Sequence, residues 1–199
     1  MGLKSYFSLV LTGCAVFYSC RQPRAKSDIE VTFNQDTITV GYTYWWPQSG
    51  PFIGNCGDEL SLVFSGIIVE MGEPNDRPGP LYVAQDGTIE LEQVYKIKEI
   101  GKNTYANQKF FKSDCFYGLN LNVGDSVLVF CYDYDDNYSI PGEKSIVKII
   151  SFEDPLIQSI KKYIDTDQDA ISIEKDTSLW VNHDLKSNLK QILECHRNE

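Results

Sequence analysis

The sequence is poor in histidine and lacks the short motifs that mark common catalytic sites. Only His183 and His196 occur, both near the end of the chain, and neither is spaced from cysteines or carboxylates as metal ligands are. There is no G-x-S-x-G sequence, no phosphate-binding loop and no C-x-x-C pair. These absences disfavour zinc chemistry and histidine-based catalysis, so we predict no catalytic residue and no cofactor.

Positive charge is also scarce. The chain has 18 lysines and arginines against 28 aspartates and glutamates, which gives a formal net charge of −10. Such a surface repels nucleic-acid phosphates and offers no basic stripe for anionic lipid headgroups. We therefore predict no nucleic-acid partner, and any attachment to a membrane must come from another feature.

Long hydrophobic runs are absent, and a short apolar run without charged residues covers 5–19, after Lys4. It is too short to span a bilayer and has the layout of a secretory signal. Two cysteines are candidate lipid-acceptor residues: Cys14, within this run in LTGC, and Cys20, directly after it in FYSC. An ordinary secretory signal or an uncleaved anchor is the alternative.

Cys14 has the more usual sequence before it, but cleavage there would leave an apolar stub. Cleavage before Cys20 instead exposes a polar stretch, RQPRAKSD, that has the composition of a tether. We therefore favour a signal peptide over 1–19, lipid attachment at Cys20 and a tether over 20–28. The expected location is the cell envelope, in the outer membrane of a Gram-negative bacterium, with the N-terminal lipid contacting the membrane.

Four cysteines remain after this assignment: Cys56, Cys115, Cys131 and Cys195. In an oxidising envelope they are candidates for two disulfides, with three connectivities that the sequence does not separate. The alternative for each is a buried free thiol, most of all for Cys131, which lies in a strand-like run.

Apolar and polar residues follow the patterns of β-strands through most of the chain and of helices near its end. The expected strands are 29–40, 60–71, 88–97, about 104–113, 125–134 and 144–151. Within 125–134 both faces look buried. After Pro155 the apolar residues fall at helical spacing, first over 156–164 and again over 185–193. We predict a mainly β domain over 29–151, a small barrel or sandwich, with a C-terminal helical segment over 152–199.

Three sequence patterns, in order, resemble the netrin-like domains, a family of OB-type barrels that includes the tissue inhibitors of metalloproteinases. They are LVFSGII at 62–68, VYK at 94–96, and Cys115 followed by GDSVLVF at 124–130. The resemblance covers about 56–150 and implies an OB-like barrel with a binding role. The inhibitors of this family bind a protease zinc through an N-terminal cysteine. We do not expect that mechanism in this chain, because Cys56 lies inside the chain and the expected N-terminus is acylated.

An aromatic, turn-rich stretch, YTYWWPQSGPF, covers residues 42–52. Its rings Tyr44, Trp45 and Trp46 are a candidate platform for a glycan or an envelope protein. The alternative is that the stretch plugs one end of the barrel. We favour the plug, because several large rings exposed together would promote aggregation.

Four aspartates match positions 1, 3, 5 and 12 of a calcium-loop template: Asp165, Asp167, Asp169 and Asp176. The template wants Gly where Ala170 stands and a bidentate Glu where Asp176 stands. We therefore favour the alternative, a solvated acidic loop that caps the next element. A second acidic run, DYDDNY at 133–138, indicates a hairpin tip.

The sequence as a whole favours a non-enzymatic envelope lipoprotein that binds another protein or a glycan. Two other functions remain open. One is an envelope hydrolase that acts on glycan or peptide through paired carboxylates, and the other is a purely structural lipoprotein.

Overall fold

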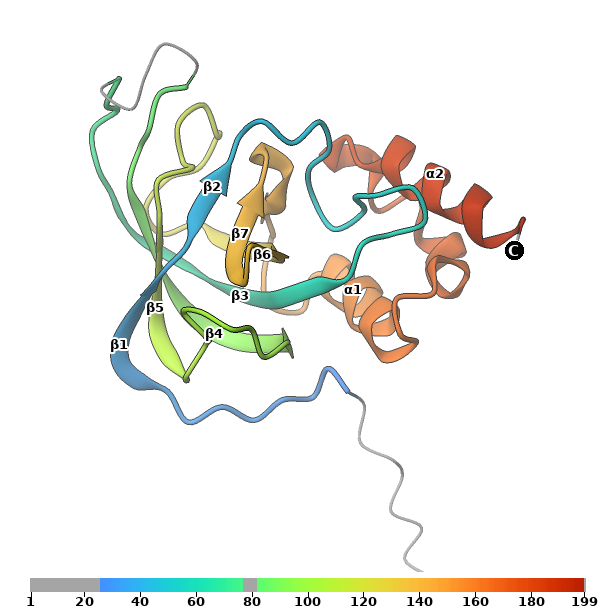
Figure 1. Cartoon of the computed structure of the whole chain (residues 1–199), viewed down its shortest axis with the longest axis horizontal. Coiled ribbons are helices and arrows are strands. Elements are labelled where there is room, and N and C mark those ends of the chain that lie inside the picture. Colours follow the sequence, from blue (N-terminus) through green and yellow to red (C-terminus); the bar gives the residue numbers. More distant parts are fainter. Residues whose placement is uncertain (1–25, 77–81, 199) are drawn as a thin grey trace, which may run out of the picture.

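The computed structural model describes residues 26–76 and 82–198, and its strands precede its helices along the chain (Figure 1). The predicted signal peptide, Cys14, Cys20 and the first part of the tether lie outside the described residues. The strands are β1 (Asn34–Thr39), β2 (Gly41–Thr43), β3 (Leu60–Met71), β4 (Gly87–Ile97), β5 (Gln108–Ser113), β6 (Ser126–Tyr134), β7 (Asn137–Pro141) and β8 (Ile146–Lys148). The α-helices are α1 (Pro155–Asp165) and α2 (Lys186–His196), with short 3-10 helices η1 (Glu143–Ser145), η2 (Ala170–Asp176) and η3 (Val181–His183).

The strands form one curled sheet in the order β1-β5-β4-β3-β6-β7-β2, with β8 also paired to β6. Strands β1 and β2 are separated only by Val40, yet they pair in parallel with β5 and β7, which lie toward opposite ends of that order. The segment 34–43 therefore joins the two ends of the sheet (Figure 1). The predicted mainly β class is confirmed, while the netrin-like identity stays a prediction.

Strand β6 is buried on both of its faces. Its side chains Val127, Val129 and Cys131 pack in the interior cluster of the curled sheet. The alternate side chains Leu128, Phe130 and Tyr132 pack in a second cluster with residues of α1 and α2. The predicted burial of both faces is thus confirmed, and its cause is the layer of helices that covers the outer face (Figure 1).

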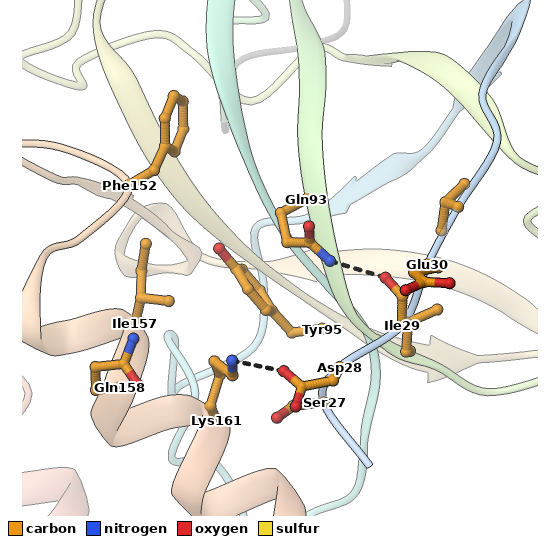
Figure 2. A pocket seen from close by; sticks show the side chains of 11 residues that line it. Ser27, Asp28, Ile29, Glu30, Gln93, Tyr95, Phe152, Ile157, Gln158 and Lys161 are labelled. Carbon is orange, nitrogen blue, oxygen red and sulfur yellow. Dashed lines mark hydrogen bonds and ion pairs between the residues drawn. The ribbon is translucent and has the colours of Figure 1, made fainter. Parts of the chain in front are cut away.

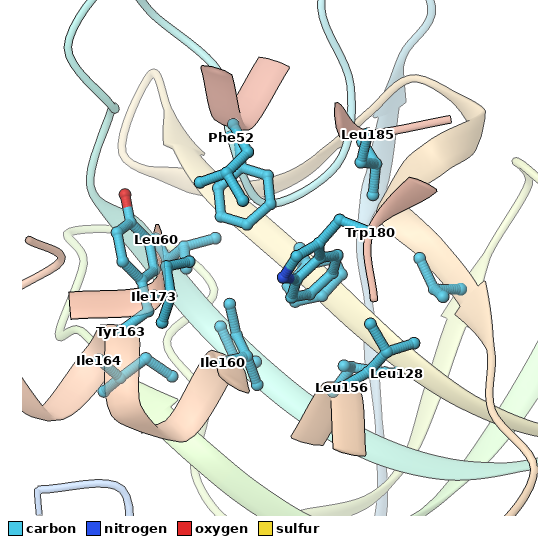
Figure 3. Close-up of a cluster of buried hydrophobic side chains, with 14 of the residues drawn as sticks. Phe52, Leu60, Leu128, Leu156, Ile160, Tyr163, Ile164, Ile173, Trp180 and Leu185 are labelled. Carbon is cyan, nitrogen blue, oxygen red and sulfur yellow. The ribbon is translucent and has the colours of Figure 1, made fainter. Parts of the chain in front are cut away.

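Helix α1 begins at Pro155, one residue before the predicted helical run over 156–164. Asp154 caps it by accepting a hydrogen bond from the Leu156 amide at 3.0 Å, and Pro155 occupies the first turn. Trp180 lies amid the buried side chains of the outer cluster (Figure 3) and is fully buried. Among the described residues, no helix is long and apolar enough to cross a membrane.

One of the two predicted disulfides is present. Cys56, in the loop before β3, is bonded to Cys195 in the last turn of α2, with their Cα atoms 5.3 Å apart. The prediction of a second bridge is wrong, because Cys115 and Cys131 are free and buried. Both pack in the interior apolar cluster, and burial raises the pKa of the Cys115 thiol to about 12, which keeps it protonated.

Strands β2 and β7 and the 3-10 helices were not foreseen from the pattern, and residues 29–33 are not in a strand. The acidic run before β7 forms a hairpin tip, as predicted, with Tyr134 paired to Asn137. Its two central residues, Asp135 and Asp136, have φ angles of 53° and 60°. Aspartate tolerates this left-handed conformation, which a two-residue hairpin turn requires.

Candidate binding groove

The aromatic stretch after β2 turns two of its rings outward. Tyr44 is 37% exposed and Trp45 56%, whereas Phe52 is fully buried in the outer cluster. The Trp46 amide donates to the Thr43 carbonyl at 3.3 Å, and the Trp46 ring packs against that same cluster. The prediction that the stretch plugs the barrel is therefore wrong for Tyr44 and Trp45, because the turn after β2 divides neighbouring rings between solvent and core.

The exposed rings belong to a continuous aromatic cluster, defined here as Tyr44, Trp45, Trp46, Tyr82 and Tyr134. Tyr44 stacks on Tyr82 with ring centroids 4.7 Å apart and meets Trp45 edge to face at 5.1 Å. Tyr134 lies 6.2 Å from Trp45 and 5.7 Å from Trp46. Such pairs restrain the rings beyond simple burial, so the surface that Trp45 presents is held in place.

A groove of about 380 Å³ lies beside this cluster. It is bounded by the link between β1 and β2, the loop after β4 and the β6–β7 hairpin. Its walls combine two cluster rings with hydroxyl, amide and carboxylate groups. The main lining side chains are Thr39, Tyr42, Trp45, Asn103, Tyr134, Asp135, Asn137 and Ser139.

The polar groups of the groove are largely neutral or compensated. Asp135 supplies the one carboxylate among the described lining residues, and it is ion-paired with Lys102 at 3.4 Å. Burial raises the pKa of Tyr42 to about 12, so its hydroxyl stays protonated. Asn103 donates to the Thr39 carbonyl at 2.7 Å and Asn137 to the Asp135 carbonyl at 2.8 Å. Each asparagine is thereby oriented, with its amide oxygen as a further acceptor.

A larger hollow, about 600 Å³, lies between residues 27–31, β4 and α1 (Figure 2). Its polar groups hold the N-terminal segment in place. Lys161 pairs with Asp28 at 2.8 Å, and the Gln93 amide donates to the Ile29 carbonyl at 2.8 Å. Because these contacts bind the chain's own segment, we place the candidate binding site at the aromatic groove instead.

The end of the predicted tether is docked on the domain. The Ser27 amide and hydroxyl donate to the Asp165 carboxylate at 2.8 and 3.1 Å, and Lys26 is ion-paired with Asp167. Ser27 is almost fully buried. Residues 26–28 of the predicted tether therefore contact α1 and the acidic residue Asp167 that follows it, because Asp28 also pairs with Lys161 of α1.

Three of the four aspartates that match the calcium-loop template have partners within the chain. Asp165 and Asp167 are used by the N-terminal segment, while Asp169 caps η2 by accepting from the Ile171 amide at 2.9 Å. Within residues 26–76 and 82–198, no group of three or more acidic, histidine or cysteine side chains is placed to hold a metal ion. Asp176 lies at the end of η2, seven residues after Asp169 in the chain. Asp169 thus caps η2, as the favoured alternative of a capping acidic loop predicts.

The substitution Asp165→Ala tests the docked N-terminal segment. Loss of both Ser27 contacts should loosen the chain around Ser27 and make the bond after Lys26 several times faster to cleave with trypsin. Limited proteolysis followed by mass spectrometry measures this rate. Asp176→Ala is the matched control, and equal cleavage in both variants would contradict the docking.

The two histidines lie outside the aromatic groove and contact other parts of the domain. The His196 ring contacts the Cys56 carbonyl oxygen at 2.7 Å and Asp169 at 3.2 Å, beside the disulfide. His183 lies in η3, where burial lowers its pKa. Neither residue lines the aromatic groove.

Sequence reasoning found Tyr44, Trp45 and Trp46 but missed Tyr82, Tyr134 and the two asparagines of the groove. The sequence offered one signal for two of these residues: Tyr134 and Asn137 lie in the acidic run at 133–138 that predicts a hairpin tip. Comparison with protein-family models and with curated proteins finds no match to this chain. Its function must therefore be argued from the geometry of the groove.

Proposed function

We propose that this chain is a lipid-anchored protein of a Gram-negative cell envelope whose OB-like β domain binds another envelope component without catalysis. The observation that carries the binding role is the outward-facing pair Tyr44 and Trp45, held by the aromatic cluster beside a groove of about 380 Å³. Exposed, ordered aromatic rings next to a concave polar surface are typical of recognition sites. The apolar run at 5–19 and Cys20 support the anchor.

The lining of the groove supports binding over glycoside hydrolysis. That reaction uses two carboxyl groups placed about 5–10 Å apart across the scissile bond. Among the described lining residues Asp135 is the single carboxylate, and Lys102 already compensates its charge.

Photocrosslinking in intact envelopes tests the proposal. Tyr44 is replaced by p-benzoylphenylalanine in the full chain, and Ile171 is replaced in the same way as the control. The two positions are equally exposed, at 37% and 38%, but Ile171 lies on the helical side in η2. Illumination should give a discrete adduct from position 44 and none from position 171, because only the first lies in the aromatic cluster.

The variant Cys20→Ser adds a test of the anchor in the same cells, and it should move the protein from the membrane fraction to the soluble fraction. Attachment that survives this change and disappears in Cys14→Ser would place the lipid at Cys14 instead. No adduct from position 44 above the level at position 171 would overturn the binding role.

A further inference from the structure

We propose that the aromatic groove binds a neutral glycan, with one pyranose ring stacked on Trp45 and its hydroxyls bonded to the amide and hydroxyl groups of the lining. This inference rests on the proposed binding function and adds the chemical class of the ligand. It follows from the exposure of Trp45, the polar lining, the absence of an uncompensated charge among the described lining residues, and the rigidity of the walls.

The size and walls of the groove suit a saccharide unit. Its volume of about 380 Å³ is at the small end of the range for ligand pockets. Trp45 leaves more than half of its surface, 56%, open to solvent. One face of a pyranose carries several C–H groups with partial positive charge, and these are attracted to the electron-rich face of an indole ring. Tyr134, at 6.2 Å and roughly perpendicular, forms a second wall.

The polar lining matches a ring of hydroxyl groups. Each sugar hydroxyl can donate one hydrogen bond and accept others, so it pairs best with groups that do both or with adjacent donors and acceptors. Asn103 and Asn137 supply amides, Tyr42 and Thr39 supply hydroxyls, and Asp135 supplies acceptors. These residues come from three separate segments, which converge only in the folded chain.

Charge argues for a neutral glycan over an acidic one or a nucleotide. Lys102 is committed to Asp135 through its carboxylate at 3.4 Å and its carbonyl at 3.2 Å. The described lining residues contain no arginine or lysine, and the whole chain carries a net charge of −10. The negative net charge of the chain would repel an anionic ligand, and the described lining residues include no free cation to pair with it.

The walls of the groove are fixed before any ligand arrives. Trp45 is restrained by Tyr44 and Tyr134, and Asn103 is tied to the Thr39 carbonyl at 2.7 Å. Asp135 and Asn103 have left-handed backbones, with φ angles of 53° and 47°, in tight turns. Preorganised polar and aromatic groups reduce the entropy lost on binding. This reduction raises the affinity for a ligand that gains little free energy from each contact, as a sugar does.

A peptide is the less suitable occupant. Peptides that bind at a sheet edge gain affinity from main-chain hydrogen bonds along an exposed strand. The strand at this edge, β2, has only three residues, Gly41–Thr43, and Pro47 follows shortly after it. The edge therefore offers too little backbone for strand addition, whereas the groove offers side-chain hydrogen-bonding groups.

Isothermal titration calorimetry of the purified, acylated full chain in a detergent without a sugar headgroup tests the inference. The probes are maltohexaose, cellohexaose, chitohexaose and mannohexaose, with hexagalacturonate as the anionic comparison. At least one neutral probe should bind saturably with a Kd below about 1 mM. Trp45→Ala should weaken that binding by at least about tenfold, and Trp45→Phe should weaken it less.

Val123→Ala is the matched control, since Val123 is 58% exposed and does not line the groove, and it should bind as the unchanged chain does. No binding of any neutral probe, equal binding by Trp45→Ala, or a preference for hexagalacturonate would each overturn the inference. A protein adduct from position 44 together with no glycan binding would overturn the glycan class alone and leave the proposed binding function standing.

Discussion

Removal of the disulfide should cost most of the stability of this domain. The bridge joins Cys56 to Cys195 across a sequence separation of 139 residues. The chain-entropy treatment gives about 5 kcal/mol for a closed loop of that length. The double substitution Cys56→Ser with Cys195→Ser should therefore lower the free energy of unfolding by up to about 5 kcal/mol, which urea denaturation followed by circular dichroism measures.

Reduction provides the control for that result. Dithiothreitol should destabilise the unchanged chain to about the level of the double variant and leave the double variant unaffected. The free thiols Cys115 and Cys131 are buried, and burial raises the pKa of both, so they should not replace the missing bridge. An unchanged unfolding midpoint in dithiothreitol would contradict the structural role of the disulfide.

Trp180→Ala should destabilise the domain by about 3–5 kcal/mol, because it leaves a large cavity at the centre of the outer cluster. Trp180 is fully buried, meets Phe52 edge to face at 4.9 Å, and donates from its indole nitrogen to the Ser159 hydroxyl at 3.2 Å. The Ser159 hydroxyl would lose its hydrogen-bond partner in addition to the lost packing. Equilibrium unfolding in urea measures the change.

The matched control is Trp45→Ala, the same substitution at a ring that is 56% exposed. It should change stability by less than about 1 kcal/mol, since little area leaves the core. A comparable loss in both variants would show that Trp45 is part of the core and would remove the basis for the groove. Trp180→Phe separates packing from hydrogen bonding, because it keeps an aromatic ring but not the indole donor.

Local sequence patterns predicted much of the fold. The alternation along 125–134 correctly divided Val127, Val129 and Cys131 from Leu128, Phe130 and Tyr132. The continuous run at 60–71 matched β3 residue for residue. The helical spacing over 156–164 matched helix α1. These features succeed because the spacing of apolar residues depends on residues that are neighbours along the chain.

The candidate site was only partly predictable. Tyr44, Trp45 and Trp46 stood out as a run of rings, but adjacent rings in a run do not show which of them will meet the core. Tyr82 and Tyr134 reach them from other segments. The partner of Asp165 was not predictable for a similar reason, since its carboxylate accepts hydrogen bonds from Ser27, 138 residues earlier in the chain.

The sequence by itself determined the order of strands before helices, the alternating faces of β6 and the acidic, histidine-poor chemistry of the chain. The tertiary structure decided which cysteines are bonded, which tryptophans are exposed and which side chains line the groove. The physical reason is distance along the chain. Cys56 meets Cys195, and Trp45 meets Tyr134, only when the curled sheet and its helical layer bring those segments together.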